Sequence, residues 1–228
     1  MTLSRRELAQ YFDHTALKPD VTTSQIEQLC REAMEHQFFG VCVNSCHIAK
    51  VAELLSGTEV VPLSVVGFPL GAMNTESKQF ETSWSIDNGA LEIDTVVNLG
   101  AYFDHNESLV RQDIAAVVKA ADDIPVKVIL ETSFLNSEQI AELSKWSCLE
   151  GAKFVKTSTG FGARGASVQD IKCMREALES INYQDKVGIK ASGGIRDLKS
   201  TLALIEAGAT RIGASASVDI LKEFSAKI

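Results

Sequence analysis

The sequence predicts a single (β/α)8 barrel that spans residues 1–228. Short apolar segments alternate strictly with longer helical ones, which is the order of βα units whose strands lie parallel. Eight such units of roughly 20 to 35 residues fit into the chain, as a compact barrel requires. A doubly wound open sheet is the alternative, but no GxGxxG motif follows the first predicted strand.

The predicted strands are apolar runs, and the predicted helices begin at capping residues and end near glycines. In the first unit Ser24 caps a helix, with Glu27 as its partner in a capping box. Ser137 caps the fifth helix, which Gly151 ends. The predicted strands are residues 11–15, 39–43, 60–66, 91–97, 125–131, 153–156, 187–190 and 210–213. The predicted helices are residues 24–36, 44–57, 74–88, 107–121, 137–148, 168–180, 197–207 and 218–226.

The bulk composition limits the classes of partner. A net charge of −8 argues against general binding to nucleic acid or to an acidic membrane surface. No run of about 18 apolar residues predicts a membrane span, and the polar N-terminus lacks the apolar core of a signal peptide. The five cysteines form no CxxC pair, which favours reduced thiols and a cytoplasmic location.

Charged residues interrupt several strands that should be continuously apolar in a covered parallel sheet. Side chains alternate along a strand, and the apolar set must face the helices. The other set therefore points to the barrel axis near the strand ends: Cys42, Asp94, Lys127, Lys156 and Lys190. Residues at the C-terminal strand ends build the active sites of such barrels. A buried ion-pair network that only supports the barrel is the alternative interpretation.

Two of these lysines predict amine chemistry. Lys156 and Lys190 each end a predicted strand and precede a loop of small residues. A lysine is nucleophilic only when neutral, and both burial and a neighbouring cation lower its pKa. One amine can then form a Schiff base with a carbonyl, whose iminium accepts electrons from an adjacent C–C bond, while a carboxylate such as Asp94 moves protons. This chemistry requires no metal and no cofactor.

A metal site has little support in the sequence. Cys42, Cys46 and His47 are close together, but no second pair of ligands follows at zinc-finger spacing. The four histidines are scattered along the chain. We therefore expect no metal.

Three loops of small residues are candidates for binding a phosphate. They are residues 158–162, 192–195 and 213–217. The last two follow the seventh and eighth predicted strands, where backbone N–H groups and a helix N-terminus bind phosphate in many barrels.

The chain resembles the 2-deoxyribose-5-phosphate aldolases over nearly its whole length. The motifs that carry the resemblance are residues 13–19 (DHTALKP), 41–44 (VCVN), 67–71 (GFPLG), 92–94 (EID), 127–131 (KVILE), 154–161 (FVKTSTGF) and 190–196 (KASGGIR). This family consists of metal-independent class I aldolases on a (β/α)8 barrel. They reversibly join acetaldehyde and glyceraldehyde 3-phosphate into 2-deoxy-D-ribose 5-phosphate, in deoxyribonucleotide and carbohydrate catabolism.

The resemblance implies roles for individual residues. Lys156 takes the position of the Schiff-base lysine, Lys190 that of the lysine that lowers its pKa, and Asp94 that of the proton-relay carboxylate. The positions that line the substrate site are Asp13, Thr15, Cys42 and Lys127. The phosphate-loop positions are Gly160, Gly193, Gly194, Gly213 and Ser215.

The resemblance has two departures. Ala163 and Arg164 stand where relatives often carry Gly or Thr, and Ala216 stands where a second serine is common. We expect Arg164 to add a cation near the phosphate and Ala216 to remove a hydroxyl donor.

Two rival functions remain at this point. One is another Schiff-base aldolase with a different carbonyl phosphate as substrate. The other is a barrel that binds a phosphorylated metabolite without turnover, with the lysines as point charges. The expected partners are a small phosphorylated sugar, acetaldehyde and, for a homodimer, a second copy of the chain.

Overall fold

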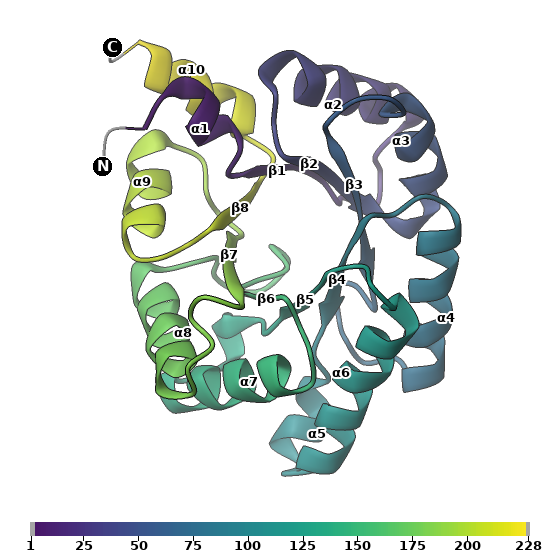
Figure 1. Cartoon of the computed structure of the whole chain (residues 1–228), viewed down its shortest axis with the longest axis vertical. Helices are drawn as coiled ribbons and strands as arrows, with labels where there is room; N and C mark the ends of the chain where they lie inside the picture. Colours follow the sequence, from purple (N-terminus) through teal and green to yellow (C-terminus); the bar gives the residue numbers. More distant parts are fainter. Residues whose placement is uncertain (1–2, 227–228) are drawn as a thin grey trace.

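Eight parallel strands close into a barrel in chain order, surrounded by helices, in this computed structural model (Figure 1). The structure describes residues 3–226. The strands are β1 (Phe12–Ala16), β2 (Gly40–Asn44), β3 (Val61–Val66), β4 (Glu92–Val96), β5 (Val126–Ile129), β6 (Phe154–Lys156), β7 (Gly188–Ser192) and β8 (Arg211–Ala214). The predicted fold class is confirmed.

The helices that follow the strands agree with the predicted segments. They are α2 (Thr23–His36), α3 (Ile48–Leu54), α4 (Thr75–Asp87), α6 (Glu107–Ala121), α7 (Ser137–Leu149), α8 (Val168–Ser180), α9 (Leu198–Glu206) and α10 (Ser217–Ser225). Two short 3-10 helices, η1 (Ser45–His47) and η2 (Thr132–Phe134), lie in the loops after β2 and β5. The prediction missed α1 (Arg5–Ala9) and α5 (Leu99–Phe103), because five residues are too few to display a helical period.

The predicted caps of two helices were wrong by one or two residues. Thr22, in extended backbone, caps α2, and its capping-box partner is Gln25. Asn136 caps α7 in the same way. Overlapping motifs, such as Thr22 with Gln25 and Ser24 with Glu27, have the same spacing, so the pattern alone does not distinguish them.

The N-terminal part of β7 was predicted correctly, but the strand continues beyond Lys190. Ala191 and Ser192 pair in register with Ile212 and Gly213 of β8. These small residues resemble a loop in sequence although they lie in a strand. Lys190 is therefore the central residue of β7, deep within the barrel.

The barrel separates an apolar layer from a charged interior. Side chains such as Val41, Ile93, Val155 and Ile212 are buried between the strands and the helices. Inside the barrel, Cys42, Leu63 and Val65 form a small apolar cluster on β2 and β3. The other strands contribute charged side chains to the interior.

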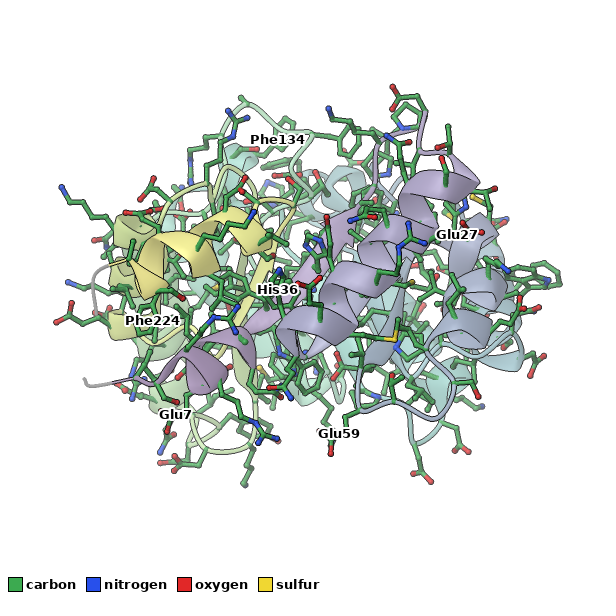
Figure 2. All side chains as sticks on the ribbon, turned by 90° about the horizontal axis from the view of Figure 1, so that it is seen from above. Glu7, Glu27, His36, Glu59, Phe134 and Phe224 are labelled. Carbon is green, nitrogen blue, oxygen red and sulfur yellow. The ribbon has the colours of Figure 1, made fainter. Side chains whose placement is uncertain are left out.

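The two ends of the barrel differ in what they carry. Figure 2 shows Phe134, which follows β5, and Glu59, which precedes β3, at opposite ends of the molecule. The end marked by Phe134 is the C-terminal end of the strands, which carries the loops of the site.

No helix within residues 3–226 has the length and apolar character to cross a membrane.

Candidate active site

Seven charged side chains meet inside the barrel, and each of them is almost fully buried. We call them the interior cluster; its members are Asp13 on β1, Glu92 and Asp94 on β4, Lys127 on β5, Lys156 on β6, Lys190 on β7 and Arg211 on β8. Strand alternation places all seven on the axis side. Buried charges require partners, and here they are each other's partners.

Asp94 is the centre of the interior cluster. Its Oδ1 accepts a hydrogen bond from Lys127 Nζ at 2.8 Å. Its Oδ2 accepts from Lys156 Nζ and from Lys190 Nζ, both at 2.7 Å. Burial alone would raise the pKa of Asp94, but the three neighbouring lysines outweigh burial and hold this pKa well below its usual value. The carboxylate therefore remains ionised.

Lys190 is held as a cation. Burial disfavours its charge, but the carboxylates of Asp13 and Asp94 outweigh burial, so its pKa is raised above the ordinary lysine value. Lys190 Nζ forms an ion pair with Asp13 in addition to its bond with Asp94. Gly213 allows this position, because a Cβ there would lie 3.0 Å from Lys190 Cε.

Lys156 has the opposite behaviour. Burial lowers its pKa; Asp94 opposes this effect, and the positive charge of Lys190 reinforces it. Lys156 is also the only member of the interior cluster that lines the cavity at the C-terminal end of the strands. It thus combines a weakened hold on its proton with access to a ligand.

This cavity has a volume of about 550 Å³. It brings together seven of the predicted site residues: Thr15, Lys156, Gly160, Gly193, Gly194, Gly213 and Ser215. The other five, Asp13, Cys42, Asp94, Lys127 and Lys190, are buried beneath it and do not line it. Burial raises the pKa of the Cys42 thiol, so this side chain is neutral.

The loops after β6 and β7 are fastened to each other. Ser192 Oγ donates to the Ser158 carbonyl at 2.5 Å, and Thr157 Oγ1 donates to the Ser192 carbonyl at 3.0 Å. Gly193 has a φ of +87°, and a Cβ there would lie 3.1 Å from Gly165 Cα. A side chain at position 193 would therefore disturb the loop that borders the cavity.

Arg164 does not lie where the sequence suggested. Its guanidinium donates to both carboxylate oxygens of Asp170, at 2.5 and 3.1 Å, and to the Thr132 carbonyl at 2.7 Å. The expectation that Arg164 adds a cation at the cavity was wrong, because Asp170, six residues later on α8, takes up its charge. The cations that line the cavity from βα loops are Lys18, after β1, and Arg196, after β7.

The loop after β8 supplies a helix N-terminus. Ala216 precedes α10 and gives its first turn no side-chain cap. Ser217 Oγ donates to the Ala214 carbonyl at 2.9 Å, whereas Ser215 is exposed and lines the cavity. In this part of the loop Ser215 is therefore the hydroxyl available to a ligand.

The predicted site residues leave out one wall of the cavity and two members of the interior cluster, Glu92 and Arg211. Gln25, Gln28 and Glu32 on α2 line the cavity beside β1. Their spacing along one helical face was a usable signal. Arg211 was missed although it alternates with Gly213 on β8, which had already been assigned to the site. Within residues 3–226, no group of three His, Cys, Asp or Glu side chains is arranged to hold a metal ion.

The fold and the site together define a (β/α)8 barrel with a buried lysine among the residues that line its cavity. The sequence model of the DeoC/LacD family aldolases matches residues 7–223. The chain belongs to this family, and it is therefore a lyase.

Several relatives of the chain are named deoxyribose-phosphate aldolase. The deoxyribose-phosphate aldolase of Bdellovibrio bacteriovorus is 50% identical over 216 residues, which cover 95% of this chain and 96% of the relative. Deoxyribose-phosphate aldolase 1 of Bacillus licheniformis is 51% identical, with 97% of each chain covered. The tetrameric deoxyribose phosphate aldolase of Aeropyrum pernix is 30% identical with a TM-score of 0.89, and the match covers 99% of this chain and 94% of that one.

Proposed function

We propose that this aldolase reversibly cleaves 2-deoxy-D-ribose 5-phosphate to glyceraldehyde 3-phosphate and acetaldehyde through a Schiff base on Lys156. The observation that carries the proposal is the placement of Lys156: this residue lines the cavity, its pKa is lowered, and its Nζ donates to Asp94. The names of relatives about 50% identical support the choice of substrate.

The reaction begins with the neutral amine of Lys156. It attacks C1 of the open-chain sugar, and loss of water gives the iminium. Asp94, with a water molecule and Lys190, takes the proton of the C3 hydroxyl. The C2–C3 bond then breaks, its electrons move into the iminium, and glyceraldehyde 3-phosphate leaves. Protonation of the enamine and hydrolysis release acetaldehyde and restore the amine.

The supporting residues divide between the two ends of the substrate. Gly160, Gly193, Gly194, Gly213 and Ser215 surround the part of the cavity next to the start of α10 and would hold the phosphate. Thr15 would contact the sugar from β1. Asp13, Cys42 and Lys127 would act from beneath the cavity, by shaping and polarising the groups that touch substrate.

A direct assay tests the proposed substrate. The protein is incubated with 2-deoxyribose 5-phosphate, and glyceraldehyde 3-phosphate is followed by coupled oxidation. A panel of other aldehyde and ketose phosphates runs in parallel. We expect cleavage of 2-deoxyribose 5-phosphate with the highest kcat/KM. A higher kcat/KM with another member of the panel would replace the substrate, and no turnover of any member would favour a binding barrel.

Arg196 provides a prediction about the phosphate. An Arg196→Met variant should raise KM for 2-deoxyribose 5-phosphate about tenfold, because a charge-assisted hydrogen bond to phosphate is lost. For unphosphorylated 2-deoxyribose, KM should stay unchanged. Arg175→Met is the matched control, since Arg175 pairs with Glu179 on α8 and does not line the cavity. An equal effect of Arg196→Met on both sugars would contradict a phosphate contact.

The homodimer remains a proposal, and α4 supports it. The buried side of this helix carries Lys78, Thr82 and Ser85, whereas Phe80 is 72% exposed and Trp84 38% exposed. This inverts the usual pattern of a helix on a sheet. We assign the outer face of α4 to a second copy of the chain, whose identical stripe is complementary to it in an isologous contact. A related aldolase, from Aeropyrum pernix, is itself an oligomer.

Light scattering after gel filtration checks the assignment. The wild-type mass should be about twice the 24.7 kDa of one chain. Phe80→Lys combined with Trp84→Lys should give the monomer mass, whereas Leu149→Lys, at an exposed site on α7, should not. A dimer that survives the double substitution would place the interface elsewhere.

The remaining parts of the proposal concern the unit and its location. We assign the activity to the whole chain, residues 1–228, as one barrel; residues 1, 2, 227 and 228 lie outside the described residues. The five free cysteines are consistent with a cytoplasmic location.

A further inference from the structure

Arg211 is buried in the interior cluster but does not line the cavity. Its Nη1 lies 2.9 Å from Asp13 Oδ1 and 3.1 Å from Glu92 Oε2. Its guanidinium carbon lies 3.4 Å from the centre of the Phe39 ring. The side chain is thus fixed on a ring face between two carboxylates, at a site that substrate does not reach.

The two carboxylates that Arg211 holds are also the partners of two lysines. Asp13 pairs with Lys190, and Glu92 Oε2 lies 2.6 Å from Lys127 Nζ. Both lysines in turn contact Asp94, which contacts Lys156. A chain of ion pairs therefore joins Arg211 to the amine at the cavity.

The charges of the interior cluster do not balance when all seven groups are ionised. The cationic groups are Lys127, Lys156, Lys190 and Arg211, and the anionic groups are Asp13, Glu92 and Asp94. The other strands that face this interior, β2 and β3, contribute the neutral side chains Cys42, Leu63 and Val65. The charged residues that line the cavity above Lys156 are Lys18, Glu32 and Arg196.

Burying net charge in a protein interior is unfavourable. With one cation in excess, the interior cluster becomes neutral when one amine loses its proton. Lys190 lies between two carboxylates, and so does Lys127. Lys156 contacts only Asp94 among the three carboxylates, and it shares the Oδ2 atom with Lys190. It is therefore the amine that most readily gives up a proton.

We propose that Arg211 is a positioning residue that keeps Lys156 neutral, because it supplies the excess positive charge of the interior cluster and holds Asp13 and Glu92 against Lys190 and Lys127. This inference rests on the proposed Schiff-base function. Without Arg211, three cations face three carboxylates, and the cluster is neutral only when Lys156 is protonated. Lys156 then needs a higher pH to become a nucleophile.

The test measures the pH dependence of imine formation. Protein is mixed with acetaldehyde and cyanoborohydride at pH values from 5 to 10, in steps of ~0.5 units. Mass spectrometry follows the rate at which the Lys156 adduct forms. In Arg211→Gln the apparent pKa of the rate should rise by about one unit, which lowers the rate about tenfold on the acidic limb. Arg211→Lys keeps the charge and should restore the wild-type profile.

A compensating variant separates charge from packing. Arg211→Gln combined with Glu92→Gln removes one charge of each sign, so one cation is again in excess, and the apparent pKa should return towards the wild-type value. Lys78→Met is the matched control: Lys78 is a buried cation paired with Asp113 outside the interior cluster. Its loss should lower the melting temperature and leave the pH profile unchanged.

The outcomes keep the two claims apart. Wild-type protein without a Lys156 adduct would refute the proposed function. A wild-type adduct with unchanged apparent pKa in Arg211→Gln would refute the role of Arg211 and leave the function intact. If Arg211→Gln does not fold, Arg211→Lys and the double variant Arg211→Gln with Glu92→Gln decide instead. Both are expected to show the wild-type pH profile of imine formation. A displaced pH profile in the double variant would overturn the inference.

Discussion

Replacing Lys156 with methionine should lower kcat/KM for 2-deoxyribose 5-phosphate by at least about 10⁴-fold. The reason is that no other lysine of the interior cluster lines the cavity, so none can replace its amine. Lys156→Arg should be equally inactive, since a guanidinium keeps the charge but does not form the imine. Steady-state kinetics on both variants measure the loss. Activity above about 1% of the wild type in either one would contradict the role of Lys156.

The same substitution should not unfold the protein. Burial lowers the pKa of Lys156, so the folded chain holds this proton less tightly than the unfolded chain. Between that lowered pKa and the ordinary lysine value, the unfolded state binds more protons, and the free energy of unfolding therefore rises with pH. Lys156→Met should lack this rise and melt no lower than the wild type at neutral pH. A large fall in melting temperature would show that the charged form is the stable one.

Replacing Asp94 with asparagine should have the second large effect, on activity and on stability together. Three lysine side chains lose their shared acceptor. Breaking a buried ion pair from one side costs about 3–5 kcal/mol, and loss of the proton relay should lower kcat about 10³-fold or more. Urea unfolding and kcat measure the two losses.

Asp113→Asn is the matched control for Asp94→Asn. It breaks the buried pair with Lys78, at 2.6 Å between Nζ and Oδ2, on the helix layer outside the barrel. We expect a comparable loss of stability with kcat nearly unchanged. If both variants lose kcat in proportion to stability, Asp94 would be a structural residue and its proton-relay role would be wrong.

Strand alternation explains why so much of the interior was predictable. The direction of a strand side chain depends on local backbone geometry, so Asp94, Lys127 and Lys156 could be assigned to the axis without knowledge of their neighbours. Their partnership follows from the topology, because the C-terminal ends of parallel strands meet at one end of a barrel. Lys190 was assigned to the correct face but to the wrong depth, because Ala191 and Ser192 resemble a loop.

The features that the sequence did not predict correctly depend on contacts between distant segments. Arg164 was expected to add a cation near the phosphate, but it pairs instead with Asp170 in the first turn of α8. On α4, the polar residues are buried because each finds a specific partner, as when Ser85 Oγ lies 3.1 Å from Ser64 Oγ. The sequence of one helix does not reveal such partners. The buried face of a helix whose buried residues are polar therefore cannot be predicted from the helix alone.

Reductive trapping tests the central claim most directly. The wild-type protein is incubated with 2-deoxyribose 5-phosphate or with acetaldehyde, reduced with borohydride, digested and mapped by mass spectrometry. The structure predicts an adduct on Lys156, the one lysine of the interior cluster that lines the cavity. An adduct on Lys190 or Lys127 instead would contradict the assignment of the nucleophile. The absence of any adduct in folded protein would contradict Schiff-base chemistry in this barrel.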